Sequence, residues 1–151
     1  MTVDGIETTF GYDSGDHRIS KTVYDISTED SVTTNEVWEG SNIICDDVGG
    51  ESPYISVYIQ GLDTEGMVYN DNFYANVYNK HGDVVSLRQV GGSTKENYQY
   101  DAYGVNTSTL TYTIPNPYRY SGEYTDVETG KQYLRARYYD PSIGRFTQAD
   151  T

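Results

Sequence analysis

The stretch NFYANVYNKHGDVVSLRQV, residues 72–90, contains two short extended segments separated by a turn. Residues 72–78 and 84–90 are rich in aromatic and β-branched side chains, which favour strands. Between them, Asn79 can start a turn through its side chain, and Gly82 supplies the positive φ that completes it. The stretch therefore predicts an antiparallel hairpin.

Two other turns repeat this arrangement of a tyrosine, then Asp or Asn, then Gly near the fourth position. One runs from Tyr100 to Gly104. The other follows Tyr12, where Gly15 comes one position early and Asp16 occupies the usual Gly site. We expect each turn to close a hairpin whose incoming strand ends in the tyrosine. The repeated positions are Tyr12, Asp13, Tyr78, Asn79, Gly82, Tyr100, Asp101 and Gly104.

Short extended segments bounded by turns recur along the chain at intervals of about ten residues. None of them keeps a helical period over several turns. The sequence therefore predicts an all-β fold, an antiparallel meander of Tyr-rich hairpins in a sheet that can curve strongly. The other predicted strands are residues 20–26, 36–45, 54–60, 67–69, 96–100, 107–114 and 132–139.

Leu, Ile, Val and Phe supply 29 of the 151 residues, a share low enough to suggest disorder in a highly charged chain. The 17 tyrosines change this interpretation, because each ring buries apolar surface while its hydroxyl keeps a polar partner. Val and Ile number 22 and Leu and Ala together only 8, which again favours strands over helices. We expect an ordered domain with much of its apolar surface supplied by tyrosine.

The chain is strongly acidic. Its 10 Lys and Arg residues against 23 Asp and Glu give a net charge of −13, which opposes binding to nucleic acid and to anionic membranes. No apolar stretch is long enough to span a membrane, and residues 1–10 lack the pattern of a signal peptide. We therefore expect no nucleic-acid partner and no membrane span.

Other chemistry-bearing residues predict no site. Cys45 precedes two carboxylates, which raise the pKa of its thiol and suppress the thiolate. His17 and His81 lie in turn segments without partners at ligand spacing, and the acidic clusters reproduce no calcium loop. We expect no metal and no other cofactor.

Two C-terminal stretches carry a much longer motif. NPYRYSGEYTDVETG, residues 116–130, and YLRARYYDPSIGRF, residues 133–146, closely resemble the RHS repeat-associated core motif, and the three turns above resemble the YD repeats of the same family. The resemblance implies YD-repeat hairpins at 1–115 and a core motif at 116–151, in one continuous sheet. The matching core positions are Tyr118, Tyr120, Gly122, Gly130, Tyr133, Arg135, Tyr138, Tyr139, Asp140, Pro141, Gly144, Arg145 and Phe146.

RHS proteins of this kind build a long β-sheet that spirals into a hollow shell around a C-terminal toxin or effector polypeptide of the same chain, and the core motif closes the shell. The resemblance therefore implies a structural section of such a shell, in a longer parent that is secreted or lies at the cell surface. An alternative is a carbohydrate-binding or adhesive cell-surface repeat region in contact with the cell wall or another carbohydrate, because aromatic pairs such as Tyr138 and Tyr139 suit sugar stacking.

In many of these proteins the core also acts as an aspartyl autoprotease. By resemblance, the active-site arginine falls on Arg137 and the first catalytic aspartate on Asp150, while the second aspartate lies beyond Thr151. The chemistry needs two carboxylates that share a proton. We therefore expect this sequence by itself not to be an enzyme. The structural alternative for Arg137 is a strand residue paired with Asp or Glu.

Overall fold

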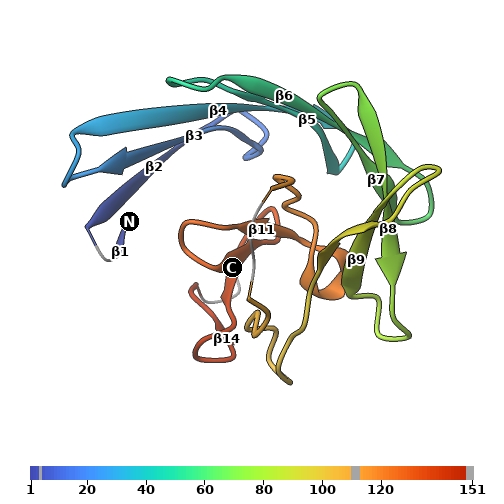
Figure 1. Ribbon diagram of the computed structural model, residues 1–151. Helices are drawn as coiled ribbons and strands as arrows, with labels where there is room; N and C mark the ends of the chain where they lie inside the picture. Colours follow the sequence, from blue (N-terminus) through green and yellow to red (C-terminus); the bar gives the residue numbers. More distant parts are fainter. Residues whose placement is uncertain (4, 110–112, 149–151) are drawn as a thin grey trace.

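The computed structural model describes residues 1–3, 5–109 and 113–148, and their strands form two antiparallel sheets (Figure 1). A 3₁₀ turn, η1 at Tyr120–Gly122, precedes the smaller sheet. The larger sheet contains β1 (Thr2–Val3), β2 (Ile6–Tyr12), β3 (Arg18–Asp25), β4 (Asp30–Glu39), β5 (Asn42–Val48), β6 (Tyr54–Gln60), β7 (Thr64–Tyr69), β8 (Asn72–Tyr78), β9 (Val84–Gln89) and β10 (Thr94–Asn97). The smaller sheet contains β11 (Tyr124–Asp126), β12 (Lys131–Tyr133), β13 (Tyr138–Asp140) and β14 (Arg145–Phe146).

Each strand of the larger sheet pairs with its neighbours in the sequence, from β1 at one edge to β10 at the other. The predicted all-β antiparallel meander is therefore confirmed. The predicted strands at 54–60 and 72–78 match β6 and β8 residue for residue. The prediction did not include β2, in which two Thr residues and a Gly weaken the apolar alternation.

Two predicted strands are wrong because each contains a turn. The segment 36–45 is broken at Gly40, which adopts a φ of 59° where β4 reverses into β5. The segment 132–139 is broken between β12 and β13, where Arg135 has a φ of 61°. The described part of the segment 107–114 contains no strand, and residues 110–112 lie outside the described residues.

The expectation of one continuous sheet is also wrong. In the described part of the chain, strands β11 to β14 pair with no strand of the larger sheet, whose strand order ends at β10. The connection between the sheets contains Pro115 and Pro117, which have no backbone N–H to donate to a ladder. A segment of this kind cannot extend the meander, so the chain starts a second sheet.

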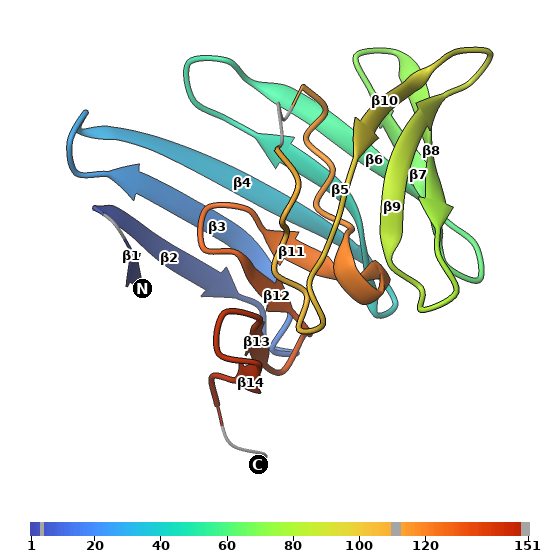
Figure 2. The same ribbon diagram turned by 60° about the horizontal axis from the view of Figure 1, so that its bottom comes forward.

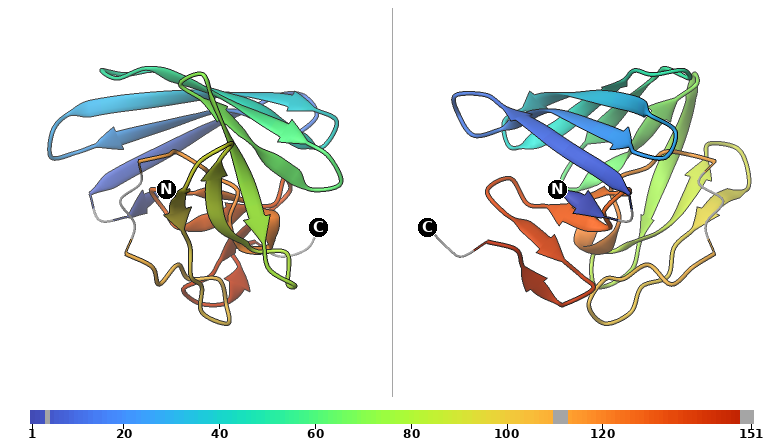
Figure 3. Two further views of the ribbon diagram at one scale, coloured as in Figure 1. Left: turned by 45° about the vertical axis from the view of Figure 1, so that its right-hand side comes forward. Right: turned by 90° about the vertical axis from the view of Figure 1, so that its left-hand side faces the viewer.

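The larger sheet arches over the smaller one, which lies on its concave side (Figures 1 and 2). Its ladder is interrupted by register shifts next to Gly11, Val37, Ile59, Val77 and Thr94. Such β-bulges bend a strand and increase its twist, which gives the sheet its curvature. Side views place the red C-terminal hairpin at the open side of the arch (Figure 3).

The three repeated turns share one hydrogen-bond pattern. In each, a side-chain oxygen of Asp13, Asn79 or Asp101 accepts the backbone N–H groups two and four residues later, at 2.8–3.0 Å. The residue four positions after the tyrosine has a positive φ in all three turns: 61° at Asp16, 90° at Gly82 and 97° at Gly104. The turn chemistry is therefore local, and Asp16 takes the backbone conformation that Gly takes in the other two turns.

Two of these glycines allow a matched test of packing. A β-carbon on Gly104 would lie 2.6 Å from the Tyr120 ring, whereas one on Gly82 would meet nothing within 4 Å. Both positions have a positive φ, so alanine at either is strained by about 1–2 kcal/mol. We expect Gly104→Ala to lose about 2 kcal/mol more than Gly82→Ala in urea unfolding, because only the former also displaces a ring. Equal losses would contradict this packing.

Tyrosine rings fill much of the space between the two sheets. Tyr58 and Tyr74 are buried from the larger sheet, and Tyr124, Tyr133 and Tyr138 from the smaller. Such rings supply the apolar area that the sparse aliphatic residues do not. Aliphatic members of the same core are Ile43, Met67, Val84, Leu87 and Ile114.

Candidate functional site: a buried ion network between the sheets

Arg18, the first residue of β3, is completely buried where the two sheets meet. Its Nε and Nη2 donate to the carboxylate of Glu36 at 2.6–3.0 Å. Nη1 and Nη2 donate to the two oxygens of Asp126 at 2.6 and 3.0 Å, and Nη1 also donates to the Tyr138 hydroxyl at 3.0 Å. One guanidinium therefore binds β4 of the larger sheet and both β11 and β13 of the smaller.

Aromatic groups complete the surroundings of Arg18. Its guanidinium carbon lies 4.2 Å from the centre of the Tyr133 ring and 5.2 Å from that of Phe10. Its backbone N–H donates to the Tyr133 hydroxyl, and its carbonyl accepts the indole N–H of Trp38 at 2.6 Å. Fixed partners of this kind offset the cost of removing a charge from water.

Lys21, three residues after Arg18 on β3, extends the same group of buried charges between the two sheets. Its ammonium lies 3.0 Å from Asp126 Oδ1 and 3.0 Å from Glu128 Oε1. Burial lowers the pKa of Lys21, but the charges of Asp126 and Glu128 outweigh burial and raise it above its usual value. Lys21 is therefore a permanent cation in this group.

Asp46 on β5 is buried against the same face. Its Oδ2 accepts the hydroxyls of Tyr58 at 2.6 Å and Tyr124 at 2.7 Å. Its Oδ1 is buried and has no hydrogen-bond partner among the described residues. Burial raises the pKa of Asp46, and the hydroxyls and cations nearby offset this only in part.

The pKa values of Glu36 and Asp126 shift in opposite directions. Burial raises the pKa of Glu36 to about 7, although its hydrogen bonds to Arg18 oppose the rise. Burial also acts on Asp126, but Lys21 and Arg18 outweigh it and hold the pKa of Asp126 below its usual value. We call Arg18, Lys21, Glu36, Asp46, Asp126 and Glu128 the ion network. It contains two cations and four carboxyl groups, so it favours retention of protons on Glu36 and Asp46.

Sequence reasoning missed this network as a site. Arg18 was visible only as the residue after the first turn, and nothing local marks Glu36 or Asp126 as its partners. These partners lie 18 and 108 residues away in the sequence. An Arg immediately after a turn and inside a strand was the one available signal.

The core-motif residues take distinct structural roles. Tyr118, Tyr133 and Tyr138 are buried in the core. The hydroxyls of Tyr120 and Tyr139 donate to the carbonyls of Ala102 and Tyr103. The carbohydrate-binding alternative therefore gains no exposed ring from Tyr118 or Tyr138. Three motif glycines have a positive φ: Gly122, Gly130 and Gly144.

The last hairpin is fixed by its own motif residues. Asp140 accepts from Lys131 Nζ at 2.8 Å and from the backbone N–H of Ser142 at 3.0 Å. Arg145 lies opposite Asp140 in the β13–β14 register, and the ring of Tyr139 meets that of Phe146 edge to face at 5.7 Å. The buried Pro141 starts the connection between these strands. These contacts assign the hairpin a structural role.

Arg137 lies between β12 and β13, not within a strand, and its guanidinium carbon is 4.0 Å from the centre of the Phe146 ring. Asp150 lies outside the described residues. The structure therefore does not test whether the two residues meet, and their role in autoproteolysis stays a prediction.

The other residues considered from sequence lie as follows. Burial, Asp46 and Asp47 raise the pKa of the Cys45 thiol. His17 stacks on Trp38 at 4.8 Å, and His81 Nδ1 lies 2.8 Å from Asp83. Within the described ranges there is no group of three or more His, Cys, Asp or Glu arranged to hold a metal. No helix in this part of the chain is long and apolar enough to cross a membrane.

The larger sheet is thus a curved antiparallel wall, and it packs onto the smaller sheet through the buried charges of the ion network. The same fold occurs in a chain of the crystal structure of TcdB2-TccC3-Cdc42, with a TM-score of 0.74 and 16% identity over 95% of this chain and 8% of that chain. The TcdB2-TccC3 structure gives a TM-score of 0.71, also at 16% identity, over 92% of this chain and 8% of that chain.

Similar sequences also occur in a nuclease and in a toxin. The tRNA3(Ser)-specific nuclease WapA of Bacillus spizizenii is 35% identical over 147 residues, which cover 94% of this chain and 6% of that protein. Double-stranded DNA deaminase toxin A of Burkholderia cenocepacia is 27% identical over 172 residues, covering 96% of this chain and 12% of the toxin. No protein-family model matches the chain. The chain thus spans only a small part of these relatives.

Proposed function

We propose that this chain is a wall section of an RHS/YD-repeat β-shell that encloses a C-terminal toxin or effector polypeptide of its parent, with residues 116–151 as the core motif that closes the shell. The observation that carries the proposal is the ten-stranded meander, which arches around the smaller sheet and is joined to it by the ion network. Because buried charges must meet their partners, the ion network fixes how the two sheets are positioned relative to each other.

The relatives support the proposed cargo. Their names describe a tRNA nuclease and a DNA deaminase toxin, and the matched segment covers 6% and 12% of them. In our proposal, the enzymatic activity belongs to another part of such a parent, and the segment represented by this chain supplies the container. This division also suits the net charge of −13, which opposes direct contact with nucleic acid.

We further propose that the parent is secreted or lies at the cell surface. Salivary gland surface protein 1 of Aedes aegypti is 35% identical over 102 residues, which cover 64% of this chain and 3% of that protein. The name of this protein, together with the toxin relative, supports an extracellular setting.

A protease-protection experiment on the full parent reading frame tests the enclosure. We expect the polypeptide downstream of residue 151 to survive trypsin in the native parent and to be digested rapidly once separated from the shell in denaturant. Digestion at the same rate in both states would exclude enclosure.

The same parent tests the autoprotease proposal. We expect an SDS gel and intact mass to show a released C-terminal fragment in the wild type and none in Asp150→Asn. Asp71→Asn is the matched control, because Asp71 is an exposed turn residue and its replacement removes the same charge. Cleavage in Asp150→Asn, or its absence in the wild type, would contradict the role of Asp150.

A further inference from the structure

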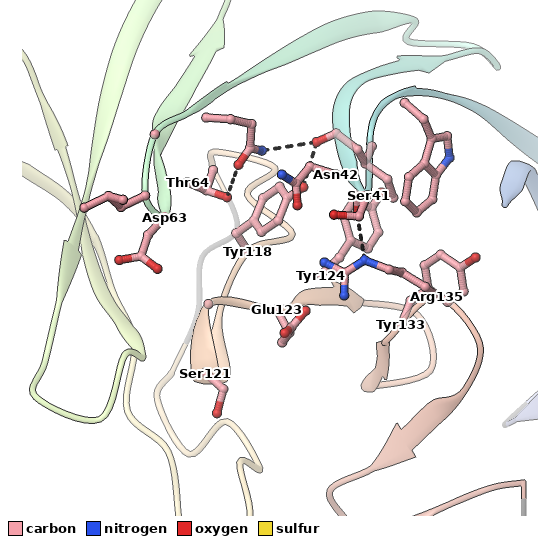
Figure 4. Close-up of a pocket in the computed structure, with 16 residues that line it drawn as sticks. Ser41, Asn42, Asp63, Thr64, Tyr118, Ser121, Glu123, Tyr124, Tyr133 and Arg135 are labelled. Carbon is pink, nitrogen blue, oxygen red and sulfur yellow. Dashed lines mark hydrogen bonds between the residues drawn. The ribbon is translucent and has the colours of Figure 1, made fainter. Parts of the chain in front are cut away.

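A hollow of about 250 Å³ opens at one end of the interface between the sheets (Figure 4). Its walls come from the β4–β5 turn, the β6–β7 turn, η1 and the connection after β12. It borders the core through Tyr118, Tyr124 and Tyr133, but the charged groups that face it are separate from the ion network. None of the motif roles described above uses this hollow.

Glu123 is the central charged group of the hollow. Its side chain is half-buried, and within the described ranges its carboxylate accepts no hydrogen bond. Burial raises the pKa of Glu123, and Arg135 opposes the rise. A carboxylate that is partly desolvated and lacks a donor is complementary to an incoming cation.

Arg135 does not satisfy Glu123. Its Nε donates to the carbonyl of Ser41 at 2.6 Å, which ties the guanidinium to the β4–β5 turn. No ion pair within 4.0 Å joins Arg135 to Glu123 in the part of the chain that the structure describes. Figure 4 shows both side chains on the same hollow. A carboxylate and a guanidinium that form no ion pair with each other therefore both line the hollow.

Several further polar side chains line the hollow, and Asn42 and Asp63 are the two that matter most for a ligand, because Gln60 and Thr64 are hydrogen-bonded to each other. Asn42 presents an amide, which can donate and accept, and Asp63 adds a second carboxylate from the β6–β7 turn. This set matches a polypeptide: the guanidinium can donate to backbone C=O groups, the amide can donate to C=O and accept from N–H groups, and the carboxylates can pair with a basic side chain. With two carboxylates and one guanidinium, the hollow carries a net negative charge.

A sugar fits these walls less well. Tyr118 and Tyr133 are buried, and His17 covers one face of Trp38 at a centroid distance of 4.8 Å. The hollow therefore offers little open ring surface, whereas sugar recognition of this kind depends on a ring to stack against.

We infer that this hollow binds an extended polypeptide segment carrying a lysine or arginine, with Glu123 receiving the cation and Arg135 holding a backbone carbonyl. The inference goes beyond the proposed enclosing role and does not depend on it, because the hollow lies wholly within this chain.

The single tryptophan of the chain, Trp38, lines the hollow and provides a fluorescence signal for binding. The probe is acetyl-alanyl-lysyl-alanine amide, and the uncharged comparison is the same peptide with glutamine in place of lysine. We expect the lysine peptide to bind about fivefold more tightly at low salt, the upper range for a partly exposed ion pair. The preference should shrink as salt is added.

Two variants locate the effect. Glu123→Gln should abolish the preference for lysine, and Asp71→Asn should keep it while removing the same charge at an exposed turn that does not line the hollow. Thermal unfolding of both variants establishes that they are folded. Equal affinity for the two peptides, or an unchanged preference in folded Glu123→Gln, would overturn the inference. Tighter binding of an N-acetylglucosamine trisaccharide than of the lysine peptide would overturn it in favour of a sugar site.

Discussion

Replacing Arg18 with methionine is expected to lower the free energy of unfolding by about 3–5 kcal/mol, enough to unfold a marginal domain. The variant keeps an unbranched side chain but leaves Glu36 and Asp126 buried without their shared cation. Removing one partner of a buried ion pair costs far more folding free energy than the intact pair contributes, because the charge that remains is buried and cannot regain contact with water. Urea unfolding followed by circular dichroism measures the loss.

Arg88→Met provides the matched control for Arg18→Met. Arg88 is an exposed residue of β9, so the same substitution there should change stability by no more than about 0.5 kcal/mol. Adding Glu36→Gln and Asp126→Asn to Arg18→Met should recover part of the loss, because these changes remove the stranded charges. A loss below about 1 kcal/mol in Arg18→Met alone would show that the ion network does not hold the two sheets together.

The second large effect is a loss of stability as the pH rises from about 4.5 to 7. Glu36 has a pKa of about 7 in the folded chain against its usual 4.5, so over this range the folded state keeps a proton that the unfolded state releases. Stability therefore falls with rising pH by up to about 1.4 kcal/mol per unit. Asp46 acts in the same direction, because its pKa is also raised.

Asp126 acts in the opposite direction and at lower pH. Its pKa lies below the usual 3.8, so its contribution is present above that value and is lost as the pH falls through its folded pKa. The network should therefore be most stabilising near pH 4 to 5. Glu36→Gln, measured by urea unfolding at a series of pH values, should flatten the decline above pH 5. An unchanged slope in this variant would contradict the assignment of the raised pKa to Glu36.

The sequence by itself determined the local structure of the repeats. Strands 54–60 and 72–78 follow from their aromatic and β-branched residues, and the turn at Asn79 follows from a side chain that bonds its own backbone. Interactions of this kind need only residues within about five positions of one another, so the residue types specify them. The breaks at Gly40 and Arg135 were missed because apolar residues lie on both sides of each turn and the extended pattern resumes after it.

Only the tertiary structure decided that the chain forms two sheets and where the smaller one lies. Tyrosines occur in strands of both sheets, so the presence of a tyrosine does not indicate which sheet a strand joins. The same holds for the site: Arg18, Glu36 and Asp126 meet because the arch brings β3 and β4 over β11. The hollow around Glu123 is likewise formed by segments from distant parts of the sequence, near residues 41–43, 60–64, 121–124 and 133–135. Periodicity and turn chemistry act over a few residues, whereas the pairing of buried charges depends on where the whole fold places them.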